Sequence, residues 1–461
     1  MRKEKDSLGE IEVESDKFWG ASTQRNLQNF TIGKEKIPLD IIYGFSIVKK
    51  AAAIANCKLN LLSIDKKNLI VTACDEILDK KYDEHFPLFI WQTGSGTPTH
   101  MNVNEVISNI AALKSNKPLG LKDPLHPNDD VNMAQSTNDT FPSAIHIAAY
   151  QKVKNTLLPA LEELKKGFDD KAFEFKDIIK VGRTHTMDAV PMTLGQEFSA
   201  FSAFIAEAIV NIKFSLQKLL KIPLGATAIG TGINAHKDYQ KLAIEEICKI
   251  TNEKFSVSDN LFQALSSSEA VCHMSSSLKN LSVSLFKIAN DITLLASGPR
   301  CAIGELILPP NEPGSSIMPG KINPAQCESV KLVAMQVMAN DSMISMANAS
   351  GNFQLNVLRT VMIYNLLQSI ELISDVSKTF LDHCLKGILP NLQRIKQNLD
   401  QNLMLATPLM KSIGYDKASK IVFEAHSKNK TLKEAALELN MMDEKTFDEI
   451  VNPKKMLGPY G

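Results

Sequence analysis

The chain has 461 residues, of which 44% are hydrophobic and 22% are charged, and this is the composition of an ordinary soluble globular protein. Its 51 basic and 51 acidic side chains cancel, which argues against a nucleic-acid or anionic-membrane surface as the main function. A chain of this length exceeds a single simple core, so we expect two or three domains.

The cysteines and the amino terminus indicate the cellular compartment. The seven cysteines are scattered, odd in number and without metal-finger spacing, as expected for reduced thiols in a reducing compartment. They are Cys57, Cys74, Cys248, Cys272, Cys301, Cys327 and Cys384. The amino terminus is charged and lacks the apolar core of a signal peptide, and no apolar run approaches the roughly 20 residues that span a bilayer. We therefore expect a soluble, cytoplasmic protein.

The first 135 residues are mixed and polar. The spacing of their apolar residues predicts helices near 41–62 and 66–80, and the stretch GEIEV predicts a short strand. We expect a first domain over 1–135, because longer helical patterns begin after it.

The central part of the chain is dominated by long helices with few charges on their inner stripes. We expect helices over Pro142–Leu164, Leu194–Leu220, 269–297 and Pro324–Met346, with a short strand within DIIKVG. The clearest apolar stripe comprises Val271, Met274, Leu278, Leu281, Leu285, Ile288, Ile292 and Leu295. A second comprises Phe198, Phe201, Ile205, Ile209, Ile212, Leu216 and Leu219. The fold is therefore expected to be mainly α, with a long helical bundle over 136–360 whose core can extend across subunits.

The last hundred residues hold shorter amphipathic helices. One more long helix begins near Val361, and two short ones are expected in TLKEAALELN and DEKTFDEIV. Their spacing resembles a helix–turn–helix, but acidic residues outnumber basic ones in 431–450, which disfavours nucleic-acid binding. We expect a third, small helical domain over 361–461.

Four polar segments share one design, in which a glycine- or hydroxyl-rich loop directly precedes a helical pattern. They are TGSGTPTHMNVNEV at 93–106, HPNDDVNMAQSTNDTFP at 126–142, GRTHTMDAVPMTLGQE at 182–197 and GSSIMPGKINPAQCE at 314–328. Helix starts expose unpaired N–H groups and a partial positive charge, which makes them sites for anions. Ordinary capping explains any one of these loops, but four of one kind favour a small anionic ligand.

The fourth segment carries the strongest signal. Residues 309–324 contain five prolines and two glycines, so they cannot be helical, and at sixteen residues they exceed the usual loop length. We expect Asn323 to cap the following helix, with Pro324 at its first position. The serine pair Ser315 and Ser316, with a lysine near this helix start, predicts a lid that closes over an anion.

Other polar groups have plainer explanations. The loop GATAIGTG at 225–232 is expected to connect helices rather than to cradle a phosphate. His126, Asp129 and Asp130 lie close in sequence, but no second histidine or cysteine stands at ligand spacing, so turn chemistry is favoured over a metal. His185 alone is equally well read as a structural histidine. We expect neither a metal nor a cofactor.

Taken in order, these segments resemble the fumarase/aspartase superfamily. GSSIMPGKINP matches its signature loop, and TGSGT, HPNDDVN, QSTND, GRTH and SGNFQLNV match its other blocks along almost the whole chain. Gly320 and INPAQCE, with FWGASTQR and LASGPRCAIGE, make the chain most similar to the class II fumarases, the iron-independent fumarate hydratases. The alternatives are an aspartate ammonia-lyase (aspartase) of the same superfamily and a non-catalytic structural protein built on the same fold.

The resemblance implies a three-domain subunit whose long helices form a twenty-helix core in a homotetramer, with active sites that three subunits share. It assigns proton transfer to Ser315 and His185 and pairs the histidine with Glu328. The dicarboxylate-binding residues that it implies are Ser95, Gly96, Thr97, Ser136, Thr137, Asn138, Thr184, Ser316, Lys321, Ile322 and Asn323. A second, non-catalytic dicarboxylate site corresponds to His126, Pro127, Asn128 and Asp129.

The reaction that the resemblance implies is the reversible hydration of fumarate to (S)-malate in the tricarboxylic acid cycle. Removing a proton next to a carboxylate concentrates charge on that carboxylate, as an aci-carboxylate, and preorganised donors such as Lys321 and Asn323 meet this charge best. Serine is a poor base in water, so Ser315 needs a positive surrounding and loop closure in order to act. His185, oriented by Glu328, would handle the water.

The chain departs from the family pattern at a few positions. Pro98, Thr99 and His100 stand where Gln, Ser and Asn are common, and Thr137 stands where a second serine is usual. Thr137 keeps the hydroxyl. Pro98 and His100 lie close to Thr97 in the first loop and are expected to change its rigidity or its local charge.

Overall fold

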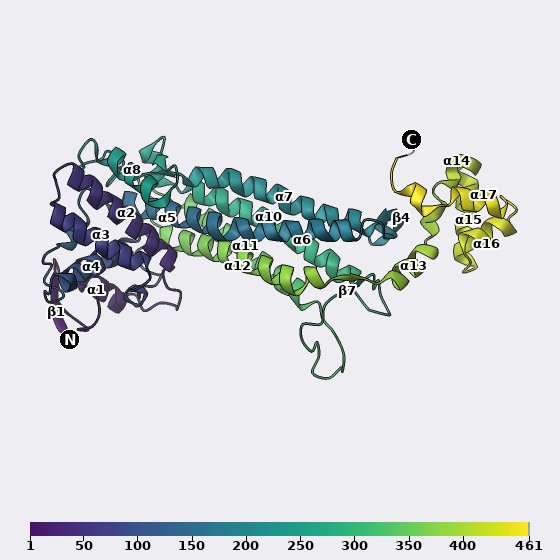
Figure 1. Cartoon of the computed structure of the whole chain (residues 1–461), viewed down its shortest axis with the longest axis horizontal. Coiled ribbons are helices and arrows are strands. Elements are labelled where there is room, and N and C mark those ends of the chain that lie inside the picture. Colours follow the sequence, from purple (N-terminus) through teal and green to yellow (C-terminus); the bar gives the residue numbers. More distant parts are fainter. Residues whose placement is uncertain (460–461) are drawn as a thin grey trace. The chain divides into compact units, whose positions relative to one another are not determined.

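The computed structural model describes residues 1–459, which are mainly helical (Figure 1). The longer helices are α2 (Leu39–Lys58), α3 (Ile64–Leu78), α4 (Thr97–Lys114), α5 (Thr137–Lys152), α6 (Leu158–Glu174), α7 (Leu194–Leu219), α8 (Tyr239–Thr251), α10 (Glu269–Leu295), α11 (Ala325–Ala349), α12 (Arg359–His383) and α15 (Tyr415–Ser427). The shorter ones are α1 (Ala21–Asn29), α9 (Leu261–Ser266), α13 (Leu392–Asp400), α14 (Leu409–Ile413), α16 (Leu432–Glu438) and α17 (Glu444–Ile450).

The strands of residues 1–459 form four two-stranded sheets. The antiparallel pairs are β1 (Arg2–Asp6) with β2 (Gly9–Val13), β3 (Ile179–Thr184) with β4 (Met187–Thr193), and β7 (Leu306–Ile307) with β8 (Leu389–Pro390). The parallel pair is β5 (Lys221–Ile222) with β6 (Ser256–Val257). The prediction of a mainly α-helical fold is confirmed.

The chain divides into two compact units, each built from three separate segments. Unit 1 comprises Met1–Pro159, Ala208–Ser282 and Met335–Ser374. Unit 2 comprises Ala160–Glu207, Val283–Ala334 and Asp375–Gly461. The division into domains 1–135, 136–360 and 361–461 stays a prediction.

The two long stripes are the part of the fold that the sequence predicts best. Every member of the stripe from Val271 to Leu295 on α10 is buried, and so is every member of the stripe from Phe198 to Leu219 on α7. Burial of a large aliphatic or aromatic side chain contributes about 1.5–3 kcal/mol, so such stripes decide where a helix packs. The expected helices near Leu39, Ile64, Ala325 and Arg359 are present within a few residues of their predicted starts.

Helix α5 begins five residues before Pro142, where the sequence suggested a helix start. Its N-cap is Ser136, and Asp139 completes a capping box by accepting a hydrogen bond from the Ser136 N–H. Pro142 therefore lies inside the helix. The expected single helix to Leu164 is instead α5 and α6 joined by one π-helical turn over Val153–Leu157.

The third polar segment is a β-hairpin, so its description as a loop directly before a helix is wrong. Strands β3 and β4 pair from Ile179 with Thr193 to Thr184 with Met187, and α7 begins only after β4. The sequence offered no Asn-Gly or Gly-Gly signal at the turn, which is what normally marks such a hairpin.

Helix α7 is also the one helix in residues 1–459 that is long and apolar enough, by length and composition, to cross a membrane. The expectation that no apolar run approaches this length is therefore wrong. The inner stripe of α7 is buried within the protein, and the core helix of a helical bundle meets the same criterion.

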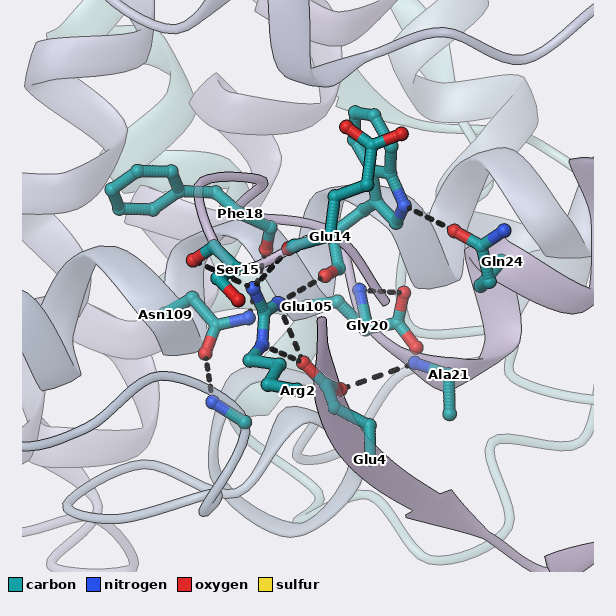
Figure 2. Close-up of polar contacts among 12 residues, drawn as sticks. Arg2, Glu4, Glu14, Ser15, Phe18, Gly20, Ala21, Gln24, Glu105 and Asn109 are labelled. Atoms are coloured by element: carbon teal, nitrogen blue, oxygen red, sulfur yellow. Dashed lines mark hydrogen bonds and ion pairs between the residues drawn. The ribbon is translucent and has the colours of Figure 1, made fainter. Parts of the chain in front are cut away.

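The amino-terminal segment is held in unit 1 by two buried carboxylates (Figure 2). Glu4 accepts a hydrogen bond from the Ala21 N–H, and Glu105 accepts from the N–H groups of Gly20, Ser22 and Thr23. These N–H groups belong to the first turn of α1, whose N-cap has no side-chain hydrogen bond of its own. The carboxylates of β1 and α4 therefore cap α1 from a distance, and the FWGAST turn is fixed in place.

The carboxy-terminal helices of unit 2 share a small apolar core. Its buried members include Leu405, Leu409, Ile421, Leu432 and Phe447. Two lysines beside this core are ion-paired, because Lys430 contacts Glu438 and Lys433 contacts Glu444 and Asp448.

Candidate functional site

The first polar loop is the start of α4, and two glycines allow it to approach neighbouring backbone. A Cβ on Gly94 would lie 1.8 Å from the Val357 carbonyl oxygen, and one on Gly96 would lie 2.4 Å from the Phe141 ring. Gly96 also has φ +81°, which favours glycine. Ser95 and Thr97 flank this residue, with their hydroxyl oxygens 3.2 Å apart. The TGSGT sequence thus brings two hydroxyls close to the start of α5.

The start of α5 is built over a buried carboxylate. Asp139 is fully buried and accepts hydrogen bonds from the N–H groups of Ser136, Gly225 and Thr227. Burial raises the pKa of Asp139 to about 6, although these donors act in the opposite direction. The loop 225–232 is therefore anchored to α5 through its N–H groups, as expected for a connecting loop rather than a phosphate cradle.

A buried arginine replaces the hydrogen bond that Pro142 cannot make. In a helix the N–H of residue 142 would bond to the carbonyl oxygen of Asn138, but proline has no N–H. Arg359 at the start of α12 donates from Nη1 to this oxygen at 2.8 Å and from Nη2 to the Leu265 oxygen at 2.7 Å. The Asn138 side chain donates to the Ala228 oxygen at 2.8 Å. Arg359 thus fixes the backbone of one of the predicted substrate-binding residues.

Two of the departures from the family pattern, Pro98 and His100, have different surroundings. Pro98 occupies the first turn of α4, where a proline is tolerated because the N–H groups there have no helical partner. His100 is 1% exposed, so it adds no surface charge. Its Nδ1 lies 2.8 Å from the Thr137 hydroxyl oxygen and its Nε2 lies 2.5 Å from Lys49 Nζ. His100 therefore ties α4 to the first residue of α5.

An open cleft of about 1050 Å³ in unit 1 is lined by the β1 segment, Thr97, Pro98, His126 and Asn128. His126 precedes a single π-helical turn over Pro127–Val131, and its Nδ1 accepts hydrogen bonds from the N–H groups of Asn128 and Asp129. Asp130 is paired with Lys66 at 2.7 Å. These contacts are the hydrogen bonds of a turn, as the sequence indicates for this segment, and the second dicarboxylate site stays a prediction.

His185 and Thr184 lie at the tip of the β3–β4 hairpin in unit 2, and both are exposed. His185 and Thr186 form the two-residue turn with φ values of +55° and +64°. Both residues occupy the left-handed region, which is unfavourable for a β-branched threonine. The turn is therefore a strained position, as is frequent at functional sites.

The base of this hairpin is held by a buried carboxylate from the LASGPRCAIGE segment. Glu305 is 0% exposed and lies 2.8 Å from Arg183 Nη2 and 3.2 Å from Lys180 Nζ. Lys180 is also paired with Glu197 at 2.8 Å. Burial alone would raise the pKa of Glu305, but the Arg183 hydrogen bond and the two positive charges outweigh it and lower that pKa. The charged network fixes the strands that present His185.

The loop between β7 and α11 leaves the helices as a long irregular segment (Figure 1). Its two ends are joined, because the Gly314 N–H donates to the Lys321 oxygen at 2.9 Å and the Asn323 amide donates to the Gly314 oxygen at 2.7 Å. A Cβ on Gly314 would lie 2.4 Å from the Lys321 oxygen, which explains the glycine. Lys321 Nζ donates to Asn323 Oδ1 at 2.6 Å. The segment is a closed loop with its own hydrogen bonds.

The Ser315 hydroxyl oxygen lies within this loop and accepts two backbone hydrogen bonds. They come from the N–H groups of Ile317 at 3.2 Å and Met318 at 3.0 Å. Donors that converge on one oxygen favour its negatively charged form. Ser316, Ile317 and Met318 are exposed, so this part of the loop is open to a ligand.

Helix α11 begins at Ala325, and its first hydrogen bond runs from the Glu328 N–H to the Pro324 oxygen. Pro324 therefore takes the cap position, and the expectation that Asn323 caps this helix is wrong, because the Asn323 side chain closes the loop instead. Glu328 is exposed on the first turn. Within the described chain no hydrogen bond or ion pair joins Glu328 to His185, so their pairing stays a prediction.

The predicted site residues fall into two groups. Ser95, Gly96, Thr97, Ser136, Thr137 and Asn138 belong to unit 1, where the starts of α4 and α5 bring them together. Thr184, His185, Ser315, Ser316, Lys321, Ile322, Asn323 and Glu328 belong to unit 2. In residues 1–459 no cluster of three or more His, Cys, Asp or Glu side chains is placed to hold a metal ion.

Sequence reasoning missed four buried groups that support the site: Lys49, Asp139, Glu305 and Arg359. One of them had a readable signal. Lys49 continues the helical stripe of Ile42, Phe45 and Ala52, so a charge stood at an inward position of α2. Asp139 has a local partner in the capping box with Ser136, but its contacts with Gly225 and Thr227 are distant in sequence. Glu305 and Arg359 act through distant partners, and no local pattern marks them.

Comparison with known proteins identifies the family of the chain. A family model described as a lyase matches residues 9–339, and one described as the fumarase C C-terminus matches residues 405–458. The chain is therefore an enzyme of the lyase class. It is 51% identical to a class II fumarate hydratase of Pasteurella multocida, over 99% of each chain, and 49% identical to one of Bacillus subtilis with the same coverage.

The solved structures agree. A class II fumarase from Schistosoma mansoni superposes with a TM-score of 0.97 at 39% identity, covering 100% of both chains. The chain belongs to the class II fumarate hydratase family.

Proposed function

We propose that the protein catalyses the reversible, stereospecific hydration of fumarate to (S)-malate in the tricarboxylic acid cycle, in the cytoplasm and without a metal or another cofactor. The observation that carries the proposal is the Ser315 hydroxyl oxygen, which accepts two backbone N–H groups inside a self-closed loop. Such donors lower the cost of an alkoxide, which is the form of serine able to take a proton from carbon.

In the direction of dehydration, Ser315 takes the proton from the malate carbon next to one carboxylate. The electron pair of the broken C–H bond moves onto that carboxylate and gives an aci-carboxylate. The electrons then return to form the carbon–carbon double bond as hydroxide leaves the neighbouring carbon. Protonation of the hydroxide completes the loss of water. Lys321, Asn323 and Ser316 supply charge and donors where negative charge develops.

The remaining site residues take the roles that the family pattern gives them. His185 handles the water or hydroxide, and Glu328 orients the imidazole. The other dicarboxylate-binding groups are Ser95, Gly96, Thr97, Ser136, Thr137, Asn138, Thr184 and Ile322. Support comes from the start of α5, where Ser136 and Thr137 precede N–H groups at a positive helix end.

The active site is proposed to be shared by three subunits of a homotetramer. The candidate residues are divided between the two units of one chain, and the long helices expose apolar faces. The exposed apolar side chains of α11 are Leu332, Met335, Met343 and Met346, and those of α7 are Phe204, Val210 and Phe214. Apolar faces of this kind mark an interaction surface, and a second copy of the chain is the partner proposed here.

The second dicarboxylate site at His126, Pro127, Asn128 and Asp129 is proposed as a non-catalytic one. His126 and Asn128 line the open cleft of unit 1, which gives a small dicarboxylate a way in. Loss of malate binding at a second stoichiometric site in a His126→Ala variant, with turnover intact, is the expected result by calorimetry.

The test of the function is to follow the absorbance of the fumarate double bond with freshly purified protein, with and without ammonia. We expect loss of fumarate without ammonia, formation of (S)-malate, and no change on adding a chelator. Aspartate formation without malate would identify an ammonia-lyase instead, and no reaction with either nucleophile would favour a structural protein. Dependence on added metal would remove metal independence from the proposal.

A further inference from the structure

Three polar side chains, each from a different helix of unit 1, form a row that begins at two buried residues and ends at the half-buried hydroxyl of a predicted substrate-binding residue. Lys49 of α2 is 0% exposed, and its Nζ lies 2.5 Å from Nε2 of His100 on α4. Nδ1 of the same ring lies 2.8 Å from the hydroxyl oxygen of Thr137 on α5. The ring stacks on Phe45 with centroids 5.2 Å apart and an angle of 11° between the planes. The imidazole is therefore held in one orientation with both nitrogens occupied.

The surroundings decide which ring nitrogen carries the proton. Burial lowers the pKa of His100 well below its usual range, and the nearby Lys49 adds to this, so the ring is neutral and has one N–H. Lys49 Nζ also donates to Asn132 Oδ1 at 3.0 Å. If Lys49 donates to Nε2 as well, two of its N–H groups have acceptors, and the ring proton must lie on Nδ1.

The opposite arrangement is less favourable. Burial lowers the pKa of Lys49 too, so a neutral amine that accepts from Nε2–H has to be considered. A neutral amine has two N–H groups, and both have acceptors if it donates to Asn132 and to Nε2. If it accepts from Nε2–H instead, one of these buried N–H groups has no acceptor, at a cost of about 1–3 kcal/mol. A charged Lys49 has no lone pair and can only donate. Both protonation states of the lysine therefore favour the ring proton on Nδ1.

We propose that His100, held by Lys49, is a positioning residue that makes the Thr137 hydroxyl a hydrogen-bond donor to the substrate carboxylate. The Nδ1–H donates to the Thr137 oxygen, so the hydroxyl proton is free to point away from the ring. Thr137 is the first residue of α5, where the N–H groups and the helix dipole also favour an anion. This inference rests on the proposed function, because it requires a dicarboxylate to bind at the start of α5.

Two amide substitutions test the contacts of the two ring nitrogens one at a time. In His100→Asn the side-chain amide takes the place of Nδ1, so a donor to Thr137 remains while the contact with Lys49 is lost. In His100→Gln the amide reaches the place of Nε2, so Lys49 keeps a partner and Thr137 loses its donor. We expect His100→Gln to raise the KM for fumarate about tenfold, the worth of one hydrogen bond to a charged group, with kcat less affected. His100→Asn should keep a near-normal KM but lower Tm.

Thr137→Val supplies the matched control, because valine keeps the shape and lacks the hydroxyl. It should raise KM at least as much as His100→Gln, and combining the two should add little, because the ring acts on the substrate only through the Thr137 hydroxyl. Additive effects, or an unchanged KM in His100→Gln, would overturn the inference. A purely structural role for His100 would lower Tm in both amide variants without separating their KM values.

A measurement on the unmodified protein covers the case in which the variants do not fold. Neutron diffraction from deuterated crystals should show deuterium on Nδ1 of His100 and none on Nε2, and the reverse would overturn the inference. Wild-type fumarate hydration in the same assay tests the proposed function separately. If the wild type is inactive while Nδ1 is deuterated, the proposed function fails and the hydrogen-bond direction stands.

Discussion

The two groups of candidate site residues are built in opposite ways. In unit 1 the starts of α4 and α5 rest on buried, hydrogen-bonded groups such as Asp139, Arg359 and His100. In unit 2 His185 and Ser316 are exposed, on a strained turn and on a self-closed loop. Under the proposed function, unit 1 supplies a rigid binding surface, and unit 2 supplies reactive groups that act once a neighbouring subunit covers them.

The largest expected effect comes from a residue of the unit 2 loop, the half-buried Ser315. Ser315→Ala removes the proposed base but leaves the loop's closing hydrogen bonds between Gly314, Lys321 and Asn323. Turnover should fall about 10²–10⁴-fold, the usual contribution of a positioned acid or base, while the assembly state and Tm change little. Steady-state kinetics with analytical ultracentrifugation measures both. Near-normal turnover would remove Ser315 from the mechanism and leave its N–H contacts as turn structure.

The second prediction concerns the network that holds the hairpin. Glu305→Gln keeps the shape and removes the charge between Arg183 and Lys180. We expect a loss of about 3 kcal/mol of stability at neutral pH, because two cations lose a buried partner. Urea unfolding of the variant and the wild type gives the difference.

The pH dependence of the same variant sharpens this prediction. The folded state lowers the pKa of Glu305, so its contribution is present above the unfolded pKa of about 4.3 and is lost as pH falls through the folded value. The gap between wild type and Glu305→Gln should therefore narrow below about pH 4. A gap that stays constant down to acid pH would mean that the carboxylate charge is not what holds the hairpin.

The parts of the structure also differ in how well the sequence predicted them. The stripes of α7 and α10 were predicted residue by residue, because a helical period is local and each buried position repeats within one or two turns. The start of α5 was readable from Ser136 and Asp139, but Pro142 pointed to a later start. The proline is tolerated only because Arg359, more than two hundred residues away, supplies the missing donor.

Strand β3 was predicted within DIIKVG, but neither its pairing with β4 nor the groups that anchor this hairpin could be predicted. His185 and Thr186 occupy positions where Asn-Gly is the usual signal, so the turn carries no sequence mark. Glu305 and Lys180 meet across 125 residues and Lys49 and His100 across 51, and such pairings follow from tertiary packing. The family motifs name the residues of the proposed site but not the buried groups beneath them.

A double-mutant cycle tests whether Arg359 replaces the missing helical donor. Arg359→Met should destabilise the protein, because the Asn138 oxygen loses its arginine donor and the Leu265 oxygen keeps only the Asn356 N–H. Pro142→Ala restores a backbone N–H that can reach the Asn138 oxygen, so it should recover part of the loss, about 1–2 kcal/mol. Chemical denaturation of the four proteins in the cycle measures the coupling. A coupling energy near zero would show that the arginine does not stand in for the proline's missing N–H.

The smallest expected effect comes from a substitution in the β3–β4 turn, where Thr186 has an unfavourable positive φ. Thr186→Gly relieves a β-branched side chain at φ +64° and should raise stability by up to about 1 kcal/mol, because glycine adopts this region without strain. Turnover should fall at the same time if the strain fixes the direction of His185 at the hairpin tip. Thr186→Asn is the matched control, since asparagine tolerates this region and keeps a side chain. Higher stability with unchanged turnover in both variants would mean that the strain is structural and that the hairpin tip needs no such fixing.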